Sequence, residues 1–331
     1  MRPFEYASPR TREQAVRLLG VPGALPLGGG SDLLALMKDG VETPRRLVNV
    51  KDLEGLHGVR SEKGGGLRIG AMTTLDDLAA DAALGWEYSA VARAAGTLAG
   101  PQIRNVATLG GNLCQRPRCW YFRNGFGLLA MKDGQSMVTA GDNRYHAILG
   151  NDGPAYFVQP STLVPVLIAV GAQVAILGPE GERRIELEKL YRIPASEGER
   201  EIDLKPGEIL TEVFLPPAAG RKIASYEVRQ RQSLDWSLAT AAVALEMDGL
   251  KVNRARVVLG QVAPIPWLAT EAEELLAGKT LDANVAGQAG EAALQKAKPL
   301  SRNKYKIQLA RIAVKRALLA AAGIMEREEE A

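Results

Sequence analysis

The chain has 331 residues, of which 46% are hydrophobic and 24% charged, and its net charge is +3. This composition is typical of a globular protein of roughly two or three domains, and the small net charge argues against nucleic-acid binding. No apolar run reaches the about 18 residues of a membrane span, the N-terminus lacks the apolar core of a signal peptide, and two cysteines are too few for a disulfide framework. We therefore expect a cytoplasmic protein without a membrane span.

The first predicted elements are a helix and a strand. Thr11 and Gln14 have the spacing of a capping box, and the apolar residues that follow give the helix one hydrophobic face, which ends at Gly20. The apolar run 24–27 predicts a buried strand. Ser31 and Asp32 then precede a short predicted helix, and either side chain is a candidate cap for it.

The glycine-rich turn between this strand and helix is a candidate phosphate-binding loop. Glycines allow the main chain to approach a ligand closely, and free N–H groups at a helix start favour an anion such as a pyrophosphate. The turn is not a Walker loop, because no Gly-Lys-Ser/Thr follows, and its glycines are contiguous rather than spaced as G-x-G-x-x-G. The alternative is a plain tight turn.

Strands are predicted next at 46–50 and 67–70, and Thr74 is expected to cap the helix after the second strand. Residues 88–95 are alanine-rich and predict another helix. Small and polar residues then dominate the segment 107–112, a composition that suits a loop wrapping a polar ligand.

Residues 117–151 are expected to form a loop-like insertion, followed by a helix at 163–170. A hairpin is predicted at 173–187 and a strand at 209–215. After a linker at 218–220, strands are predicted at 223–231, 239–246 and 251–259, and helices at 268–277, 283–297 and 304–322. The acidic run 326–330 is expected to be disordered.

The order of these motifs resembles one protein family. The turn Gly-Gly-Gly-Ser-Asp-Leu (28–33), the segment Ile-Gly-Ala-Met-Thr-Thr-Leu (69–75) and the segment Gln-Ile-Arg-Asn-Val-Ala-Thr-Leu-Gly-Gly-Asn (102–112) are similar to the FAD-binding medium subunit of the molybdenum hydroxylases. That family includes carbon monoxide dehydrogenase, xanthine dehydrogenase and aldehyde oxidoreductases. Pro-Ser at 160–161, Leu-Gly-Gln-Val-Ala-Pro at 259–264 and Leu-Ala-Gly-Lys at 276–279 extend the resemblance over nearly the whole chain.

The resemblance implies an α+β fold. It places a two-part FAD-binding domain of the vanillyl-alcohol-oxidase (PCMH) type at 1–218, with subdomains at about 1–60 and 61–218 and the insertion at about 117–151. A C-terminal α+β domain, like that of the carbon monoxide dehydrogenase flavoprotein, follows at 219–325, with an acidic tail at 326–331.

The resemblance also implies a role as an FAD-dependent oxidoreductase subunit. Such a subunit takes electrons from a [2Fe–2S] small subunit, supplied by a molybdopterin large subunit, and passes them to an external acceptor. Substrate chemistry would take place on the partner, so no catalytic residue is expected here. Export together with a partner that carries a signal remains an alternative to the cytoplasm.

The resemblance further implies which residues bind FAD. Main-chain N–H groups of the glycine-rich turn would bind the pyrophosphate, the Thr108 hydroxyl would bind a phosphate or the ribitol, and Gly111 would let the main chain pass close to the cofactor. The expected cofactor-binding residues are Leu25, Pro26, Leu27, Gly28, Gly29, Gly30, Ser31, Asp32, Leu33, Thr108, Gly110, Gly111, Asn112, Thr162 and Leu163.

The sequence departs from the family pattern in three places. Some relatives hold a [4Fe–4S] cluster in the insertion with four cysteines, whereas this chain has only Cys114 and Cys119, so we predict no metal site and free, partly buried thiols. Thr162 stands where the family usually has an aspartate. Glu227 stands where a lysine is often a neighbour of the flavin, and a carboxylate there would disfavour the anionic reduced flavin.

Two other functions are weighed against this one. Thr162, Glu227 and the missing cysteines are also compatible with a structural or assembly subunit that has weakened or lost flavin binding. A stand-alone flavin oxidase would need an active-site base, and the only histidines, His57 and His146, lie in no catalytic motif.

Overall fold

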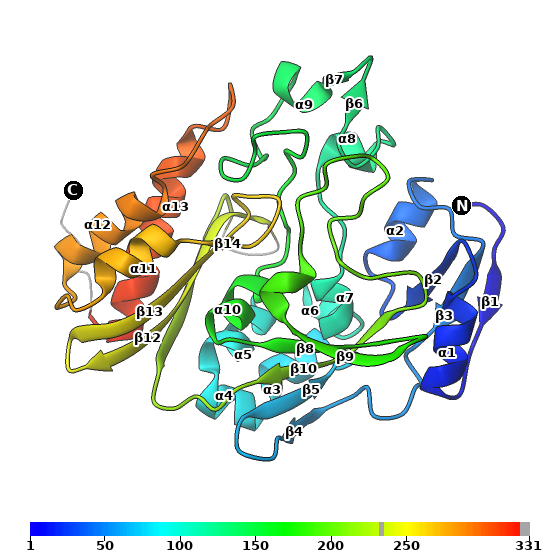
Figure 1. Ribbon diagram of the computed structural model, residues 1–331, viewed down its shortest axis with the longest axis horizontal. Helices are drawn as coiled ribbons and strands as arrows, with labels where there is room; N and C mark the ends of the chain where they lie inside the picture. The colour runs from blue at the N-terminus through cyan, green and yellow to red at the C-terminus, as the bar shows by residue number, and fades with distance from the viewer. Residues whose placement is uncertain (232–234, 325–331) are drawn as a thin grey trace.

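A computed structural model describes residues 1–231 and 235–324, so the expected acidic tail lies outside the described residues. Three units follow one another along the chain (Figure 1). A small parallel sheet carries the N-terminus, a five-stranded antiparallel sheet forms the centre, and a four-stranded antiparallel sheet with its helices forms the C-terminal part.

The first sheet has the strand order β1-β3-β2 and is parallel throughout. Its helix α1 begins after Thr11, whose hydroxyl accepts the N–H of Gln14 at 3.2 Å, and ends at Gly20, as expected. Strand β1 was not expected. The elements of this unit are β1 (Glu5–Ala7), α1 (Arg12–Leu19), β2 (Ala24–Leu27), α2 (Leu33–Lys38) and β3 (Arg46–Asn49).

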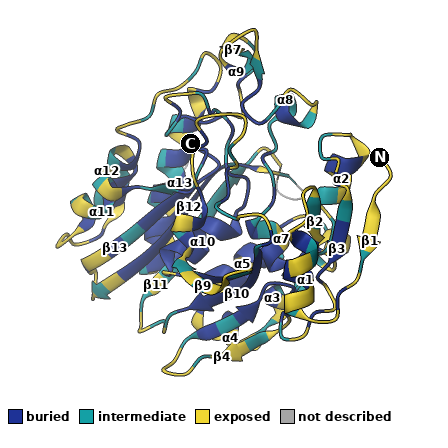
Figure 2. Cartoon of the chain, turned by 45° about the vertical axis from the view of Figure 1, so that its right-hand side comes forward, coloured by how far each residue is buried: buried dark blue, intermediate teal, exposed yellow. Residues whose placement is uncertain are grey.

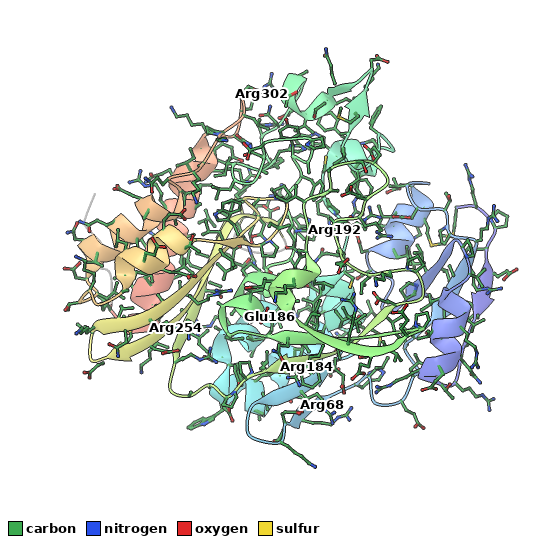
Figure 3. The ribbon with its side chains drawn as sticks, viewed as in Figure 1. Arg68, Arg184, Glu186, Arg192, Arg254 and Arg302 are labelled. Atoms are coloured by element: carbon green, nitrogen blue, oxygen red, sulfur yellow. The ribbon has the colours of Figure 1, made fainter. Side chains whose placement is uncertain are left out.

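The central sheet has the order β4-β5-β10-β8-β9 and is antiparallel. Strand β10 enters between β5 and β8 from far along the chain. The strands are β4 (Val59–Ser61), β5 (Leu67–Gly70), β8 (Gln173–Gly178), β9 (Gly181–Glu186) and β10 (Ile209–Leu215). Exposed charged side chains such as Arg184 and Glu186 project from β9 (Figure 3), and the Arg184 guanidinium lies 3.6 Å from the centre of the Phe214 ring.

Short helices connect and cover the central sheet. Thr74 caps α3 as predicted, because its hydroxyl accepts the N–H of Asp77. Helix α10 is buried at every residue (Figure 2) and lies between the central sheet and the C-terminal part. The helices are α3 (Leu75–Ala80), α4 (Ala82–Glu87), α5 (Ser89–Gly96), α6 (Pro101–Arg104), α7 (Leu109–Leu113), α10 (Leu163–Ala169) and the 3₁₀ helix η1 (Leu187–Leu190).

The predicted insertion rises above the sheets at the top of Figure 1. It is less irregular than expected, since it contains two short helices and a hairpin: α8 (Trp120–Arg123), β6 (Met131–Lys132), β7 (Gln135–Ser136) and α9 (Met137–Ala140).

The C-terminal sheet has the order β11-β12-β13-β14 and separates two apolar cores. On β12, Ala241 and Val243 face the core formed with α11, α12 and α13, while Ala242 and Ala244 belong to the core of the first two units. This alternation follows from the two-residue period of a strand. The elements are β11 (Lys222–Arg229), β12 (Ser237–Asp248), β13 (Lys251–Gly260), β14 (Trp267–Leu268), α11 (Thr270–Leu276), α12 (Ala283–Ala293) and α13 (Tyr305–Ala322).

Candidate functional site

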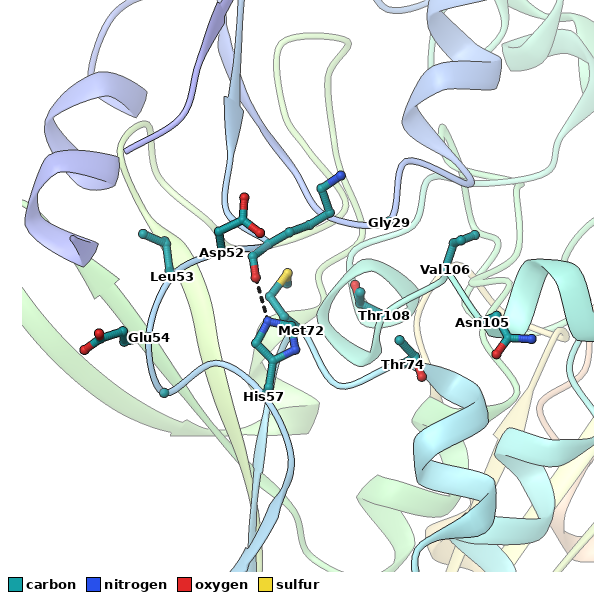
Figure 4. A pocket seen from close by; sticks show the side chains of 12 residues that line it. Gly29, Asp52, Leu53, Glu54, His57, Met72, Thr74, Asn105, Val106 and Thr108 are labelled. Carbon is teal, nitrogen blue, oxygen red and sulfur yellow. Dashed lines mark hydrogen bonds between the residues drawn. The ribbon is translucent and has the colours of Figure 1, made fainter. Parts of the chain in front are cut away.

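The two loops expected to bind a cofactor lie against each other. A cavity of about 590 Å³ opens beside them, and Gly29 of the first loop and Thr108 of the second both line it (Figure 4). A Cβ added at Gly29 would lie 1.7 Å from the carbonyl oxygen of Val106, so the main chains meet where only glycine fits. The close contact with Val106 therefore explains why residue 29 is a glycine.

The glycine-rich turn keeps its hydrogen-bond donors free. No described residue accepts a hydrogen bond from the main-chain N–H of Gly29, Gly30, Ser31 or Asp32. The preceding strand ends with Leu27, which is buried, whereas the three glycines are half-buried and Ser31 is exposed. Main-chain N–H groups need a partner, so four consecutive free donors, the first of them on Gly29 in the cavity wall, fit an anionic ligand.

Asp32 does not cap helix α2, contrary to one of the sequence expectations. It occupies the N-cap position, but its side chain makes no capping hydrogen bond. Its carboxylate instead accepts the main-chain N–H of Arg116 at 2.9 Å and a guanidinium N–H of Arg123 at 2.8 Å, and it lies 3.1 Å from the guanidinium of Arg118. The Asp32 carboxylate therefore binds arginines at the start of the insertion, while the main-chain N–H of Asp32 can still donate to a ligand.

The second loop is anchored by its own main chain. The N–H groups of Leu109 and Gly110 donate to Thr73 and Ala71, and the N–H of Gly111 donates to the Thr108 hydroxyl oxygen at 3.1 Å, which caps helix α7. The main-chain N–H groups of residues 109–112 are therefore already engaged, and the loop offers a ligand the Thr108 hydroxyl proton. The bond to Gly111 uses only an acceptor site of that hydroxyl, so the proton can still be donated.

Thr162 and its neighbours form a buried polar group next to the second loop. Ser161 donates to the Asn112 side chain at 2.5 Å, which fixes the last residue of the second segment. The Thr162 hydroxyl is 3% exposed and has no hydrogen-bond partner among the described residues. Leu163 follows it, fully buried at the start of α10. A buried hydroxyl without a partner is costly, and it fits a position that a bound cofactor completes.

Sequence reasoning missed part of the cavity wall. The connection between β3 and β4 lines one side with Lys51 and His57, and Met72 lines another. Nε2 of the His57 ring donates a hydrogen bond to the Lys51 carbonyl oxygen, 2.5 Å away (Figure 4). A loop of mixed polar residues carries no motif, so no pattern in the sequence pointed to it.

Glu227 is held in a second cavity of about 520 Å³ between α5 and β11. Its carboxylate lies 2.6 Å from the guanidinium of Arg229 and accepts hydrogen bonds from the hydroxyls of Ser237 and Thr97, at 2.5 and 3.1 Å. The side chains of Glu227 and Arg229 are only 13% and 12% exposed. The negative charge that departs from the family pattern is therefore paired.

The two cysteines are free and half-buried, as the sequence predicted. Burial raises the pKa of Cys114 to about 12. The Cys119 sulfur lies 3.1 Å from Nε2 of His146, and burial together with the nearby Lys306 charge lowers the pKa of that histidine to about 4. Within residues 1–231 and 235–324, no three His, Cys, Asp or Glu side chains are grouped to hold a metal ion.

Comparison with known proteins gives this geometry its context. The family model for the FAD binding domain in molybdopterin dehydrogenase matches residues 2–218, and that for the CO dehydrogenase flavoprotein C-terminal domain matches residues 224–321. Among the described residues, no helix is long and apolar enough to cross a membrane.

Individual relatives cover nearly the whole chain. The aldehyde oxidoreductase FAD-binding subunit PaoB of Escherichia coli is 34% identical over 94% of this chain and 96% of its own. The carbon monoxide dehydrogenase medium chain of Afipia carboxidovorans is 33% identical over 84% and 81%. The crystal structure of a cyanide-inactivated Cu,Mo-CO dehydrogenase matches with a TM-score of 0.75 at 29% identity, over 98% of this chain and 99% of that one. The predicted fold, a two-part FAD-binding domain followed by a C-terminal α+β domain, is confirmed.

The two loops pack together beside free main-chain donors, and the family matches span both parts of the chain. The chain therefore belongs to the FAD-binding medium subunits of the molybdenum hydroxylases, which are oxidoreductase subunits.

Proposed function

We propose that this chain binds FAD between its two loops and passes electrons from a [2Fe–2S] small subunit to an external acceptor. A molybdopterin large subunit of the same complex would carry out the substrate chemistry. The observation that carries the proposal is the row of free N–H groups at residues 29–32, which begins at Gly29 in the wall of a cavity that Thr108 also lines.

The residues of this chain would bind and orient the cofactor. The N–H groups of the glycine-rich turn would donate to the diphosphate, and the Thr108 hydroxyl, which accepts from Gly111, would donate its proton. The buried Thr162 hydroxyl, which has no partner among residues 1–231 and 235–324, would gain one. FAD supplies the redox chemistry when it is bound, so the protein needs no acid or base of its own for this role.

The names of the relatives support the proposal that this chain has partner subunits. Two of them are named as the medium chain of a carbon monoxide dehydrogenase, which describes one member of a larger complex. We place the boundary between the FAD-binding and C-terminal parts at residues 218 and 219, between the ranges of the two family models. We also propose a cytoplasmic location, since the free cysteines suit a reducing compartment, and we propose that the insertion holds no iron–sulfur cluster.

The test is the flavin content of the intact complex. The gene should be expressed with its neighbouring genes, and the purified complex assayed for FAD and iron and checked for reduction of its flavin by substrate. One FAD per chain, reduced on addition of substrate, is expected. A complex that assembles fully without FAD and cannot be reconstituted would instead identify a structural or assembly subunit.

A further inference from the structure

The Asp32 carboxylate sits at a junction between the cofactor-binding turn and a charged segment, residues 115–123, which we call the arginine strap. Both carboxylate oxygens are engaged by the strap, one by the N–H of Arg116 and the other by the guanidinium groups of Arg118 and Arg123. The Asp32 side chain is 14% exposed. An aspartate at an N-cap ordinarily accepts a capping hydrogen bond from its helix, but Asp32 makes no such bond to α2. Its side chain binds the strap instead.

The rest of the strap is fixed by further charged contacts. Arg116 pairs with Glu42 and, at 2.5 Å, with Glu201. Arg123 donates to the carbonyl oxygens of Pro117 and Arg116. These guanidinium groups are mostly buried, at 12% and 16% exposure. Removing the Asp32 charge would leave the buried Arg123 guanidinium without its carboxylate partner in a poorly solvated place, and the strap would shift to relieve this.

Arg118 extends the connection to the C-terminal part of the chain. One of its nitrogens lies 3.1 Å from Asp32, another donates to the Gln115 side chain at 3.0 Å, and the guanidinium lies 4.4 Å from the centre of the Trp236 ring. Burial lowers the pKa of this guanidinium to about 10, so it is still charged at neutral pH. Arg118 therefore links Asp32 to Trp236, through an ion pair on one side and a cation–π interaction on the other.

We propose that Asp32 is a positioning residue: its carboxylate holds the arginine strap beside the glycine-rich turn, and Arg118 couples that turn to Trp236. The turn would thereby keep the N–H groups of residues 29–32 directed at a diphosphate. This inference rests on the proposed function, and it assigns the Asp32 side chain to the strap rather than to the cofactor.

The experiment measures the dissociation constant of FAD for the full chain, from the quenching of flavin fluorescence. Asp32→Asn keeps the size of the side chain and removes its charge, and we expect affinity to fall about tenfold or more, the scale seen for residues that orient metal ligands. Asp32→Glu restores the charge and should recover part of the affinity. Glu5→Gln breaks an exposed ion pair with Arg46 in the same unit and should bind FAD like the wild type.

The coupling is tested with Arg118→Met, Trp236→Leu and the double variant. If Arg118 and Trp236 act together, each single change weakens FAD binding and the double variant is no weaker than Arg118→Met alone. Losses that add, or an unaffected Trp236→Leu, would overturn the coupling. Circular dichroism of each FAD-free variant checks folding. Arg118→Lys, which keeps the charge opposite Asp32 but loses the planar guanidinium over Trp236, replaces Arg118→Met in the cycle if that variant fails to fold.

The outcomes separate this inference from the proposed function. A wild-type chain that binds no FAD would refute the function itself. A wild-type chain that binds FAD, with a folded Asp32→Asn variant of equal affinity, would refute only the positioning role.

Discussion

The carbonyl oxygen of Val106 occupies the place that a side chain at Gly29 would need, because a Cβ built on Gly29 falls 1.7 Å from it. This contact joins two loops that are separated by more than seventy residues of sequence. It also fixes how the donor-rich turn faces the second loop, so the cavity beside both loops depends on a residue without a side chain.

We expect Gly29→Ala to push the loops apart. The change should lower the free energy of unfolding by about 2 kcal/mol and weaken FAD binding, measured by chemical denaturation and flavin fluorescence. Gly85→Ala is the matched control, because a Cβ at Gly85 in helix α4 meets no atom within 4 Å. If Gly29→Ala binds FAD as tightly as Gly85→Ala, the contact with Val106 does not matter for the cofactor.

Thr162→Val should have opposite effects on the two forms of the protein. The FAD-free form should gain about 1 kcal/mol of stability, since a buried hydroxyl without a partner among the described residues is removed. FAD affinity should fall if that hydroxyl bonds the cofactor. Thr211→Val provides the contrast, because the Thr211 hydroxyl already donates to Ala175 at 3.3 Å. Unfolding curves with and without FAD distinguish the cases, and unchanged affinity in Thr162→Val would remove this residue from the site.

The paired charge at Glu227 predicts opposite shifts of the flavin potential. Glu227→Gln removes a negative charge and should raise the midpoint potential, whereas Arg229→Gln removes the compensating positive charge and should lower it. Redox titration of the FAD-loaded chain gives both values. If neither variant changes the potential, the flavin lies far from this ion pair, and the resemblance fails at this position.

Lys306 predicts a pH dependence of stability. This side chain is 1% exposed, its ammonium donates to the carbonyl oxygens of Tyr145, His146 and Gln261, and burial lowers its pKa to about 7. The unfolded chain, with an ordinary lysine pKa of about 10.4, binds more protons than the folded chain between these values. Stability contributed by this group is therefore present at high pH and lost as pH falls towards 7.

The measurement is the free energy of unfolding against pH from neutral to alkaline conditions. Lys306 should make the free energy of unfolding of the wild type rise as the pH increases over this range, and Lys306→Met should lack this rise. Lys298→Met serves as the control, because Lys298 forms an exposed ion pair with Asp152. Parallel curves for the wild type and Lys306→Met would contradict the predicted shift.

Local patterns predicted the elements that local chemistry controls. The helix capped by Thr11, the helix capped by Thr74 and the hairpin around Gly181 were correctly predicted because a cap or a turn depends on a few neighbouring residues. Even there a detail differs, since the Gln14 side chain accepts the N–H of Arg10 rather than that of Thr11.

Relationships over long sequence distances could not be predicted in this way. Strand β10 pairs with β5, which precedes it by about 140 residues, and no pattern in either strand names its neighbour. Strands β1 and β4 have three residues each, too few to show alternation. The use of Asp32 by the arginine strap likewise depends on the path of the insertion, whereas the glycine-rich turn itself was visible as a motif.

The two-sided burial of β12 affects how the chain can be divided. Ala242 and Ala244 pack with the flavin-binding half, while Ala241 and Val243 pack with the C-terminal helices. A gene fragment ending at residue 218 would bare the apolar surface that this strand normally covers, and such a fragment would be prone to aggregate. Separate family models match the two halves, but both halves pack against the same strand, β12. They should therefore be produced, purified and stored as a single polypeptide.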